Sequence, residues 1–165
     1  LVPLLSHTRE AGKLAAQSIM TTDTVSKEVA VTMEIGGKTV TLGGMCKGSG
    51  MIHPNMCTML GFLTTDVAIS KELLQKALST VVKDTYNMVS VDGDTSTNDT
   101  VLLLANGAAG NDEITEEKED YQTFLDALLY VNTCLAKKIA GDGEGCTALF
   151  EVKIVGAETK DQAKV

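Results

Sequence analysis

The chain has 165 residues, of which 44% are hydrophobic, and this length is enough for one domain with a buried core. Its 22 acidic and 14 basic residues give a net charge of -8, and no basic cluster with interleaved aromatic residues is present, which argues against a nucleic-acid partner. No apolar run reaches the roughly 18 to 20 residues that span a bilayer, and no secretory leader opens the sequence, so we expect a cytoplasmic protein.

The first half of the sequence predicts one helix followed by three strands. Residues 8–20 predict a packed helix, because small and apolar side chains recur at helical spacing at Ala11, Leu14, Ala15, Ser18 and Ile19. Residues 28–44 alternate with period two around Gly36-Gly37, which predicts two strands joined by a tight turn. The apolar run 59–69 predicts a third strand that is buried on both faces.

The second half predicts two more helices and two more strands. Ser70 can cap a helix whose apolar residues recur at helical spacing. The run 101–106, closed by Asn106-Gly107, indicates a strand, and an acidic loop then leads into a helix with inward side chains at Tyr121, Phe124, Leu125, Leu128 and Leu135. Residues 147–155 predict a final strand, so the fold class is α/β or α+β.

Two patterns that bind metals in other proteins are weak here. The four cysteines (Cys46, Cys57, Cys134 and Cys146) show no C-x-x-C pair and no histidine at zinc spacing, so we expect reduced thiols and no metal site. Residues 90–100 carry oxygen-bearing side chains at every second position, as a calcium loop does. Thr97 and Leu103 stand where such a loop needs glycine and glutamate, so a tightly hydrogen-bonded turn is the better interpretation.

Two candidate nucleophiles, Cys57 and Thr58, stand side by side in an apolar segment that glycines and Pro54 interrupt. A Cys–His pair would need His53 to reach Cys57, which Pro54 disfavours. Both candidates could instead be ordinary buried residues. In a third interpretation the chain cuts itself before Thr58, whose freed α-amine then serves as the base for its own hydroxyl.

Glu144 stands between two glycines in the segment 141–147, GDGEGCT. A plain surface turn is one interpretation of this segment. In the other, the glycines let the backbone approach a ligand, and the Glu144 carboxylate binds an amine or ammonium group.

Four segments together resemble the ornithine acetyltransferase (glutamate N-acetyltransferase) family of arginine biosynthesis. They are IMTTDT (19–24), KGSGMIHPNMCTMLGFLTTD (47–66), VDGDTSTNDTVLLLANGAAG (91–110) and DGEGCT (142–147). The resemblance implies the N-terminal-nucleophile-like fold shared with the β-aminopeptidases, an αββα sandwich with two packed sheets between helical layers. It also implies that residues 1–165 are the central part of a single acetyltransferase domain.

The resemblance implies an activity as well. The family cleaves before the threonine that corresponds to Thr58, so we expect self-cleavage between Cys57 and Thr58. Acetyl would then move from N2-acetyl-L-ornithine to L-glutamate through an acetyl-Thr58 intermediate. Thr21, Lys47, Thr58 and Glu144 match the family's substrate-contacting residues. No cofactor is implied, and acetyl-CoA remains an alternative acetyl donor.

Some expectations concern the rest of the protein. The oxyanion-hole Thr-Gly pair of the family and its C-terminal substrate contacts match nothing in residues 1–165, so we expect this chain alone to be nearly inactive. The implied partners are N-acetylornithine, glutamate, the remaining segments of the same protein and further copies in a homo-oligomer. An N-terminal-nucleophile amidohydrolase or β-aminopeptidase, and a catalytically silent fragment, stay as alternatives. His53 and Cys57 stand where the family usually has alanines.

Overall fold

The described residues form one sheet and three α-helices. The computed structural model describes residues 8–53 and 59–164. In chain order the elements are α1 (Arg9–Ser18), β1 (Lys27–Ile35), β2 (Lys38–Lys47), β3 (Leu60–Thr65), α2 (Lys71–Asp84), the 3-10 helix η2 (Tyr86–Met88), β4 (Thr100–Ala105), α3 (Glu119–Gly141) and the 3-10 helix η3 (Gln162–Lys164).

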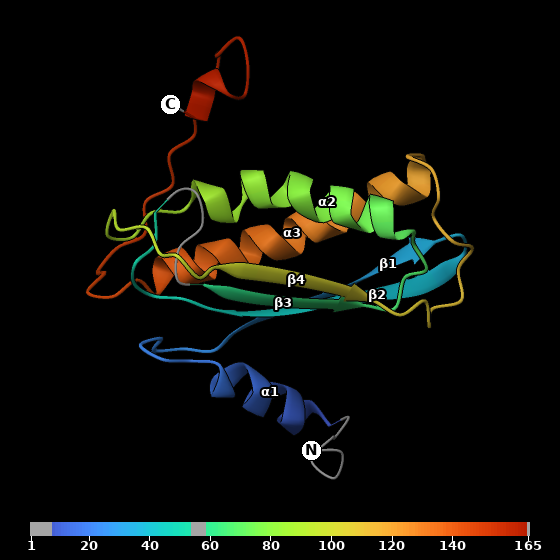
Figure 1. Cartoon of the computed structure of the whole chain (residues 1–165), viewed down its shortest axis with the longest axis horizontal. Coiled ribbons are helices and arrows are strands. Elements are labelled where there is room, and N and C mark those ends of the chain that lie inside the picture. The colour runs from blue at the N-terminus through green and yellow to red at the C-terminus, as the bar shows by residue number, and fades with distance from the viewer. Residues whose placement is uncertain (1–7, 54–58, 165) are drawn as a thin grey trace.

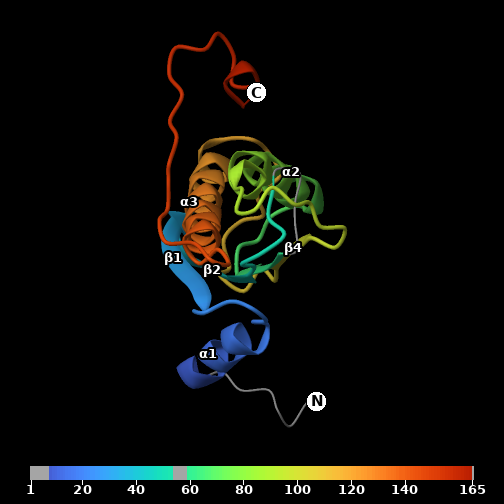
Figure 2. The ribbon, with the colours of Figure 1, turned by 90° about the vertical axis from the view of Figure 1, so that its left-hand side faces the viewer.

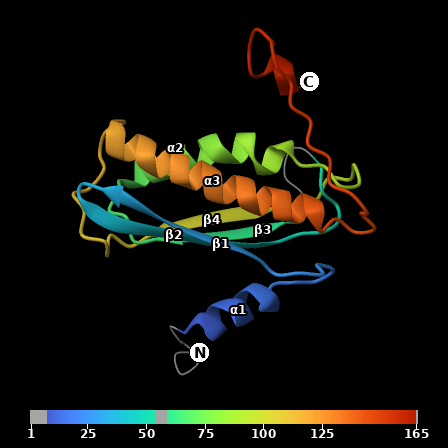
Figure 3. The same cartoon turned by 180° about the vertical axis from the view of Figure 1, so that it is seen from behind.

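The four strands lie in the order β1-β2-β3-β4. Strands β1, β2 and β3 pair antiparallel, whereas β3 and β4 pair parallel. Helices α2 and α3 lie side by side over one face of the sheet, and α1 lies on the other side (Figures 1 and 3). The predicted mixed α/β class is therefore confirmed, and the described residues contain one sheet of the implied sandwich. None of the described helices is long and apolar enough to cross a membrane.

The first hairpin has the turn that its sequence predicts. Gly36 and Gly37 have φ angles of 55° and 70°, in the left-handed region that a two-residue type I′ turn requires at both positions. Ile35 pairs with Lys38 across the turn, and this register continues to a Lys27 pair with Cys46 at the other end of β1. The register places Lys27 on the same face of the sheet as Cys46, the face that the helices cover.

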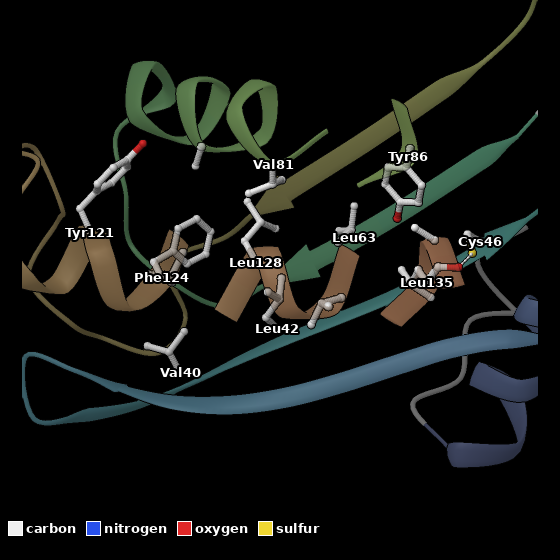
Figure 4. Close-up of a cluster of buried hydrophobic side chains, with 14 of the residues drawn as sticks. Val40, Leu42, Cys46, Leu63, Val81, Tyr86, Tyr121, Phe124, Leu128 and Leu135 are labelled. Atoms are coloured by element: carbon white, nitrogen blue, oxygen red, sulfur yellow. Dashed lines mark hydrogen bonds between the residues drawn. The ribbon is translucent and has the colours of Figure 1, made fainter. Parts of the chain in front are cut away.

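The core lies between the sheet and the α2–α3 layer (Figure 4). Phe124, Leu128 and Leu135 of α3 are fully buried, as predicted, and Leu63 of β3 is 1% exposed. Gly44 allows α3 to approach β2 closely, because a Cβ at this position would lie 3.1 Å from Leu135 Cδ1. Near this contact the Cys46 thiol donates to the carbonyl oxygen of Leu135, with an S···O distance of 3.9 Å.

Two further predictions in the second half are confirmed. The Ser70 hydroxyl accepts a hydrogen bond from the Leu73 N–H at 3.4 Å and caps the N-terminus of α2. Strand β4 occupies the predicted run and ends before Asn106-Gly107, where Gly107 has a φ of 70°.

The expected burial of β3 on both faces is wrong. Its inward residues are buried, but Phe62 is only half-buried and Thr64 is exposed on the opposite face. On the same face of β4, Leu102 is 46% exposed and Leu104 is 64% exposed. The reason is that α2 and α3 cover only one side of the sheet.

Two other expectations also fail. Helix α1 does not pack on the predicted face, because Leu14 is 62% exposed and Ala16, on a different side, is its one fully buried residue. Residues 147–155 form no strand, since no strand of the described sheet pairs with them. Their apolar side chains are exposed at Leu149, Phe150, Val152, Ile154 and Val155.

Candidate active site

Three segments that are distant in sequence meet beside the end of β2. They are residues 21–24, residues 48–52 and the turn 142–145. The Glu144 N–H donates to the Ser49 carbonyl oxygen at 2.6 Å, and the Thr22 and Ser49 hydroxyl oxygens are 2.5 Å apart. Figure 2 views the molecule from this end. The segments that carry Thr21 and Glu144 are therefore neighbours of the segment that directly follows Lys47.

A buried ionic cluster lies beneath these segments. The Lys27 ammonium is 2.6 Å from Asp23 Oδ1 and 2.5 Å from Asp142 Oδ2. The Lys27 and Asp23 side chains have no exposed surface, and Asp142 is only 7% exposed. A charge buried this deeply requires partners of opposite sign, and Lys27 has two of them.

The two carboxylates of this cluster also hold the backbone. Asp23 accepts the Gly48 N–H at 2.7 Å and the Thr21 N–H at 3.2 Å. Asp142 accepts the Thr24 N–H at 3.0 Å, and the Thr24 hydroxyl also donates to it. The cluster therefore holds the backbone at three places. These are Thr21, Gly48 directly after Lys47, and Asp142, two residues before Glu144.

Both carboxylates of the cluster have a pKa below the ordinary value of 3.8. Burial alone would raise the pKa of Asp142, but hydrogen bonds from Lys27 and Thr24 lower that pKa to about 2. Burial likewise opposes ionisation of Asp23, and the bonds from Gly48 and Lys27 outweigh it and lower the pKa. These depressed pKa values stabilise the fold at pH above the ordinary value of 3.8, and the stabilisation from Asp142 is lost as the pH falls towards 2.

The predicted substrate-contacting residues differ in their exposure. Lys47 is 7% exposed, and the described part of the chain provides no salt bridge to its ammonium. Thr21 and Glu144 are exposed. The Glu144 side chain lies against Gly50, where a Cβ would come within 2.7 Å of Glu144 Oε2. A cation and a carboxylate on adjoining segments are suited to an amino-acid substrate, which carries both charges.

A fourth segment, the loop before β4, packs against residues 51–53. Asp92 accepts the Met51 N–H at 2.5 Å and the Ile52 N–H at 3.0 Å, and these bonds hold Met51 at a φ of 51°, which is unusual for a residue other than glycine. The Asp94 N–H also donates to Asp92, at 3.2 Å. The predicted hydrogen-bonded turn is therefore confirmed. Within the described ranges no group of three or more His, Cys, Asp or Glu side chains could hold a metal ion.

The predicted cleavage site, Cys57 and Thr58, lies outside the described residues. The next residue, Met59, donates its N–H to Asp99 Oδ1 at 2.7 Å. His53 is exposed, and its Nδ1 is 3.2 Å from the Ser90 hydroxyl.

Sequence reasoning found no role for Asp23, Lys27, Asp99 or Asp142. Asp23, Asp99 and Asp142 stand inside the segments that carry the family resemblance, which was the available signal. The pairing of Lys27 with Asp142 joins residues 115 positions apart, and only the fold brings them together.

The sequence is similar to known proteins of arginine biosynthesis. The model of the ArgJ family matches residues 2–165. The arginine biosynthesis bifunctional protein ArgJ of Symbiobacterium thermophilum is 56% identical over 155 residues, which are 94% of this chain and 39% of that protein. The Bacillus subtilis protein of the same name is 51% identical over 164 residues, or 99% of this chain and 40% of that protein.

A solved structure is also similar to this chain. The crystal structure of the arginine biosynthesis bifunctional protein ArgJ from Bacillus halodurans has a TM-score of 0.50 and 49% sequence identity, and the match covers 52% of this chain and 40% of that one. This likeness is consistent with the N-terminal-nucleophile fold. The chain spans about two fifths of the length of the curated relatives that it matches, 39% and 40% in the two named above. It belongs to the ArgJ family.

Proposed function

We propose that the full-length protein carrying this chain is an ornithine acetyltransferase of arginine biosynthesis. It cuts itself between Cys57 and Thr58 and then transfers acetyl from N2-acetyl-L-ornithine to L-glutamate through an acetyl-Thr58 intermediate. The observation that carries the proposal is the junction of the segments bearing Thr21, Lys47 and Glu144 in a member of the ArgJ family. Residues 1–165 form the central part of one acetyltransferase domain, completed by the remaining segments of the same protein and assembled as a homo-oligomer.

The chemistry needs no cofactor. The Thr58 hydroxyl attacks the acetyl carbonyl of N-acetylornithine, its own α-amine takes the proton, and the same proton passes to the departing ornithine nitrogen. Glutamate then attacks the acetyl ester, and the hydroxyl regains a proton as N-acetylglutamate leaves. An α-amine has a pKa of about 8 in peptides, and a nearby Lys47 cation would lower it and favour the basic form. Acetyl-CoA stays an alternative donor in this scheme.

Each remaining residue has one task in this proposal. Glu144 binds the ammonium group of ornithine or glutamate, Lys47 binds a substrate carboxylate, and the Thr21 hydroxyl donates a hydrogen bond. The burial of Lys47 supports its role, because a largely buried lysine that has no salt bridge to another described residue is stabilised by a bound anion.

A product assay of the full-length protein tests the function. With N-acetylornithine and glutamate together, we expect N-acetylglutamate and ornithine with ping-pong kinetics, because the acetyl group passes through the enzyme. Without glutamate, we expect little more than one acetyl adduct per active site. Acetate formed at the same rate with and without glutamate would show a hydrolase and refute the proposal.

We expect Glu144→Gln to weaken binding of ornithine and glutamate substrates. Loss of a hydrogen bond to a charged group costs about 1.5 to 3 kcal/mol, which is a roughly tenfold to hundredfold rise in KM. Self-cleavage should be unchanged, since the Glu144 N–H that donates to Ser49 is retained. The matched control is Glu113→Gln, an exposed glutamate in the loop before α3. Equal kinetics of the two variants would return Glu144 to the surface-turn interpretation.

A further inference from the structure

The proposed acetyl donor carries its two charges at a fixed separation. In N2-acetylornithine the α-amine is acetylated, so the ammonium group lies at the end of the side chain, away from the α-carboxylate. In the proposed function Lys47 binds this carboxylate and Glu144 binds this ammonium group. Residues that fix the position of Glu144 relative to Lys47 would therefore select the length of the substrate side chain.

Glu144 has one direct attachment to the segment that follows Lys47. Its N–H donates to the Ser49 carbonyl oxygen at 2.6 Å. Its side chain lies against Gly50, where a Cβ would come within 2.7 Å of Glu144 Oε2. A single hydrogen bond fixes a distance but not the orientation of a turn, and a binding residue must be held in both. The turn therefore needs a second attachment.

The buried ionic cluster supplies this second attachment. Asp142 lies two residues before Glu144, and its Oδ2 is 2.5 Å from Lys27 Nζ. On the other side of the cluster, Lys27 Nζ is 2.6 Å from Asp23 Oδ1, which also accepts the Gly48 N–H at 2.7 Å. A continuous path of three short polar contacts therefore joins Gly48, the residue that follows the proposed carboxylate-binding lysine, to the turn of Glu144.

This path is rigid because its members are buried and have several partners. The Lys27 and Asp23 side chains have no exposed surface, and that of Asp142 is 7% exposed. Asp142 also accepts hydrogen bonds from the Thr24 N–H, at 3.0 Å, and from the Thr24 hydroxyl. Thr24 directly follows Asp23, so both carboxylates are attached to one short stretch of backbone. Charged hydrogen bonds in a network shielded from water hold their geometry better than exposed pairs do.

We propose that Asp142 is a positioning residue that sets the length of the accepted substrate. Through Lys27 and Thr24 it holds its turn at one distance from the segment that follows Lys47. Glu144 then meets the ammonium group of N2-acetylornithine, but not that of a homologue with a longer or shorter side chain. Asp142 does not touch the substrate. The inference rests on the proposed function, because it uses the tasks given there to Lys47 and Glu144.

Asp142→Ala tests the proposal in the full-length protein. The measured quantity is the kcat/KM for N2-acetyl-L-ornithine divided by that for N2-acetyl-L-lysine, whose side chain is one methylene longer. In the wild-type protein we expect a ratio of roughly 10 to 100, the usual discrimination for one methylene. The variant should lower this ratio at least about threefold, because the turn loses its second attachment. Lys27 keeps Asp23 as its partner, so the remaining pair is electrically balanced.

The ratio separates positioning from a general loss of structure. A smaller fraction of folded protein lowers both kcat/KM values alike and leaves their ratio unchanged. The matched control is Asp126→Ala, which removes an exposed aspartate of α3 and should keep the wild-type ratio. A fall of less than about threefold in Asp142→Ala overturns the proposal, and so does a wild-type ratio of about 1.

A second pair of variants leaves Asp142 in place. Thr24→Val removes the hydroxyl that donates to Asp142 and keeps the shape of the side chain, whereas Thr24→Ser keeps a hydroxyl. We expect the ratio to fall at least about twofold in Thr24→Val, for loss of one hydrogen bond, and to keep its wild-type value in Thr24→Ser. Equal ratios in these two variants overturn the inference. Absence of N-acetylglutamate with the wild-type protein would instead refute the proposed function.

Discussion

Thr58→Ala should leave the full-length protein as one uncut chain with no acetyltransferase activity. The variant lacks the hydroxyl that attacks the Cys57 carbonyl in the proposed self-cleavage, and without the cut it also lacks the free α-amine proposed as the base of the transfer. Loss of a covalent nucleophile typically removes several orders of magnitude of rate, so the remaining activity should be undetectable. Intact mass before and after brief exposure to N-acetylornithine measures both effects, because acetylation of Thr58 adds one acetyl group.

Two neighbouring variants are the controls for this result. Thr58→Ser keeps a hydroxyl and should still cut, whereas Cys57→Ala restores the residue that is usual in the family and should cut normally. A block in Cys57→Ala would make the Cys57 thiol a participant in the cleavage. Cleavage of Thr58→Ala into two fragments would rule out a mechanism in which the Cys57 acyl group moves from the Thr58 nitrogen to the Thr58 oxygen.

Local signals in the sequence predicted the parts of the fold that depend on local chemistry. The Gly36-Gly37 turn follows from the positive φ angles that two adjacent glycines allow, and the start of α2 follows from the side-chain cap of Ser70. Helix α3 follows from the spacing of its apolar residues, which is a strong signal over 23 residues.

The failed predictions all concern the contacts that a helix or strand makes with other parts of the fold. The alternating pattern in residues 147–155 is a correct strand signal, but a strand also needs a hydrogen-bonded neighbour. The apolar content of β3 does not reveal that helices cover one face of the sheet only, which leaves Phe62 half-buried. The small residues of α1 fit a packed helix, yet Leu14 lies outward because α1 stands apart from the α2–α3 layer.

The candidate site also has a part that the sequence predicted and a part that depends on tertiary structure. Family resemblance selected Thr21, Lys47 and Glu144 by their motifs, and the structure brings their segments together. The resemblance could not indicate which residues hold these segments in place. Lys27 reaches Asp142 only through the register of β1 against β2 and the path of α3. A pairing of this kind requires tertiary structure, and no spacing rule predicts it.

Lys27→Met should be the most destabilising of the substitutions considered. It leaves Asp23 and Asp142 buried without their cation, and breaking a buried ion pair in this way typically costs about 3 to 5 kcal/mol of unfolding free energy. Urea denaturation of the full-length protein measures the loss. The control is Lys76→Met, which breaks the exposed pair with Glu117, where the two side chains are 54% and 51% exposed. An exposed pair contributes about 0 to 1 kcal/mol, so equal losses in the two variants would contradict the role given to the buried cluster.

The pH dependence of this loss distinguishes charge from packing. In the wild-type protein Asp142 has a pKa of about 2, and it favours the fold at every pH above 3.8. In Lys27→Met the burial of Asp142 is no longer opposed by the ammonium, so its pKa rises and it takes up a proton as the pH falls. Protonation removes the unpaired charge, and the difference in unfolding free energy between the two proteins should narrow from pH 7 towards pH 3. A difference that stays constant over this range would mean that Lys27 stabilises the fold by packing alone.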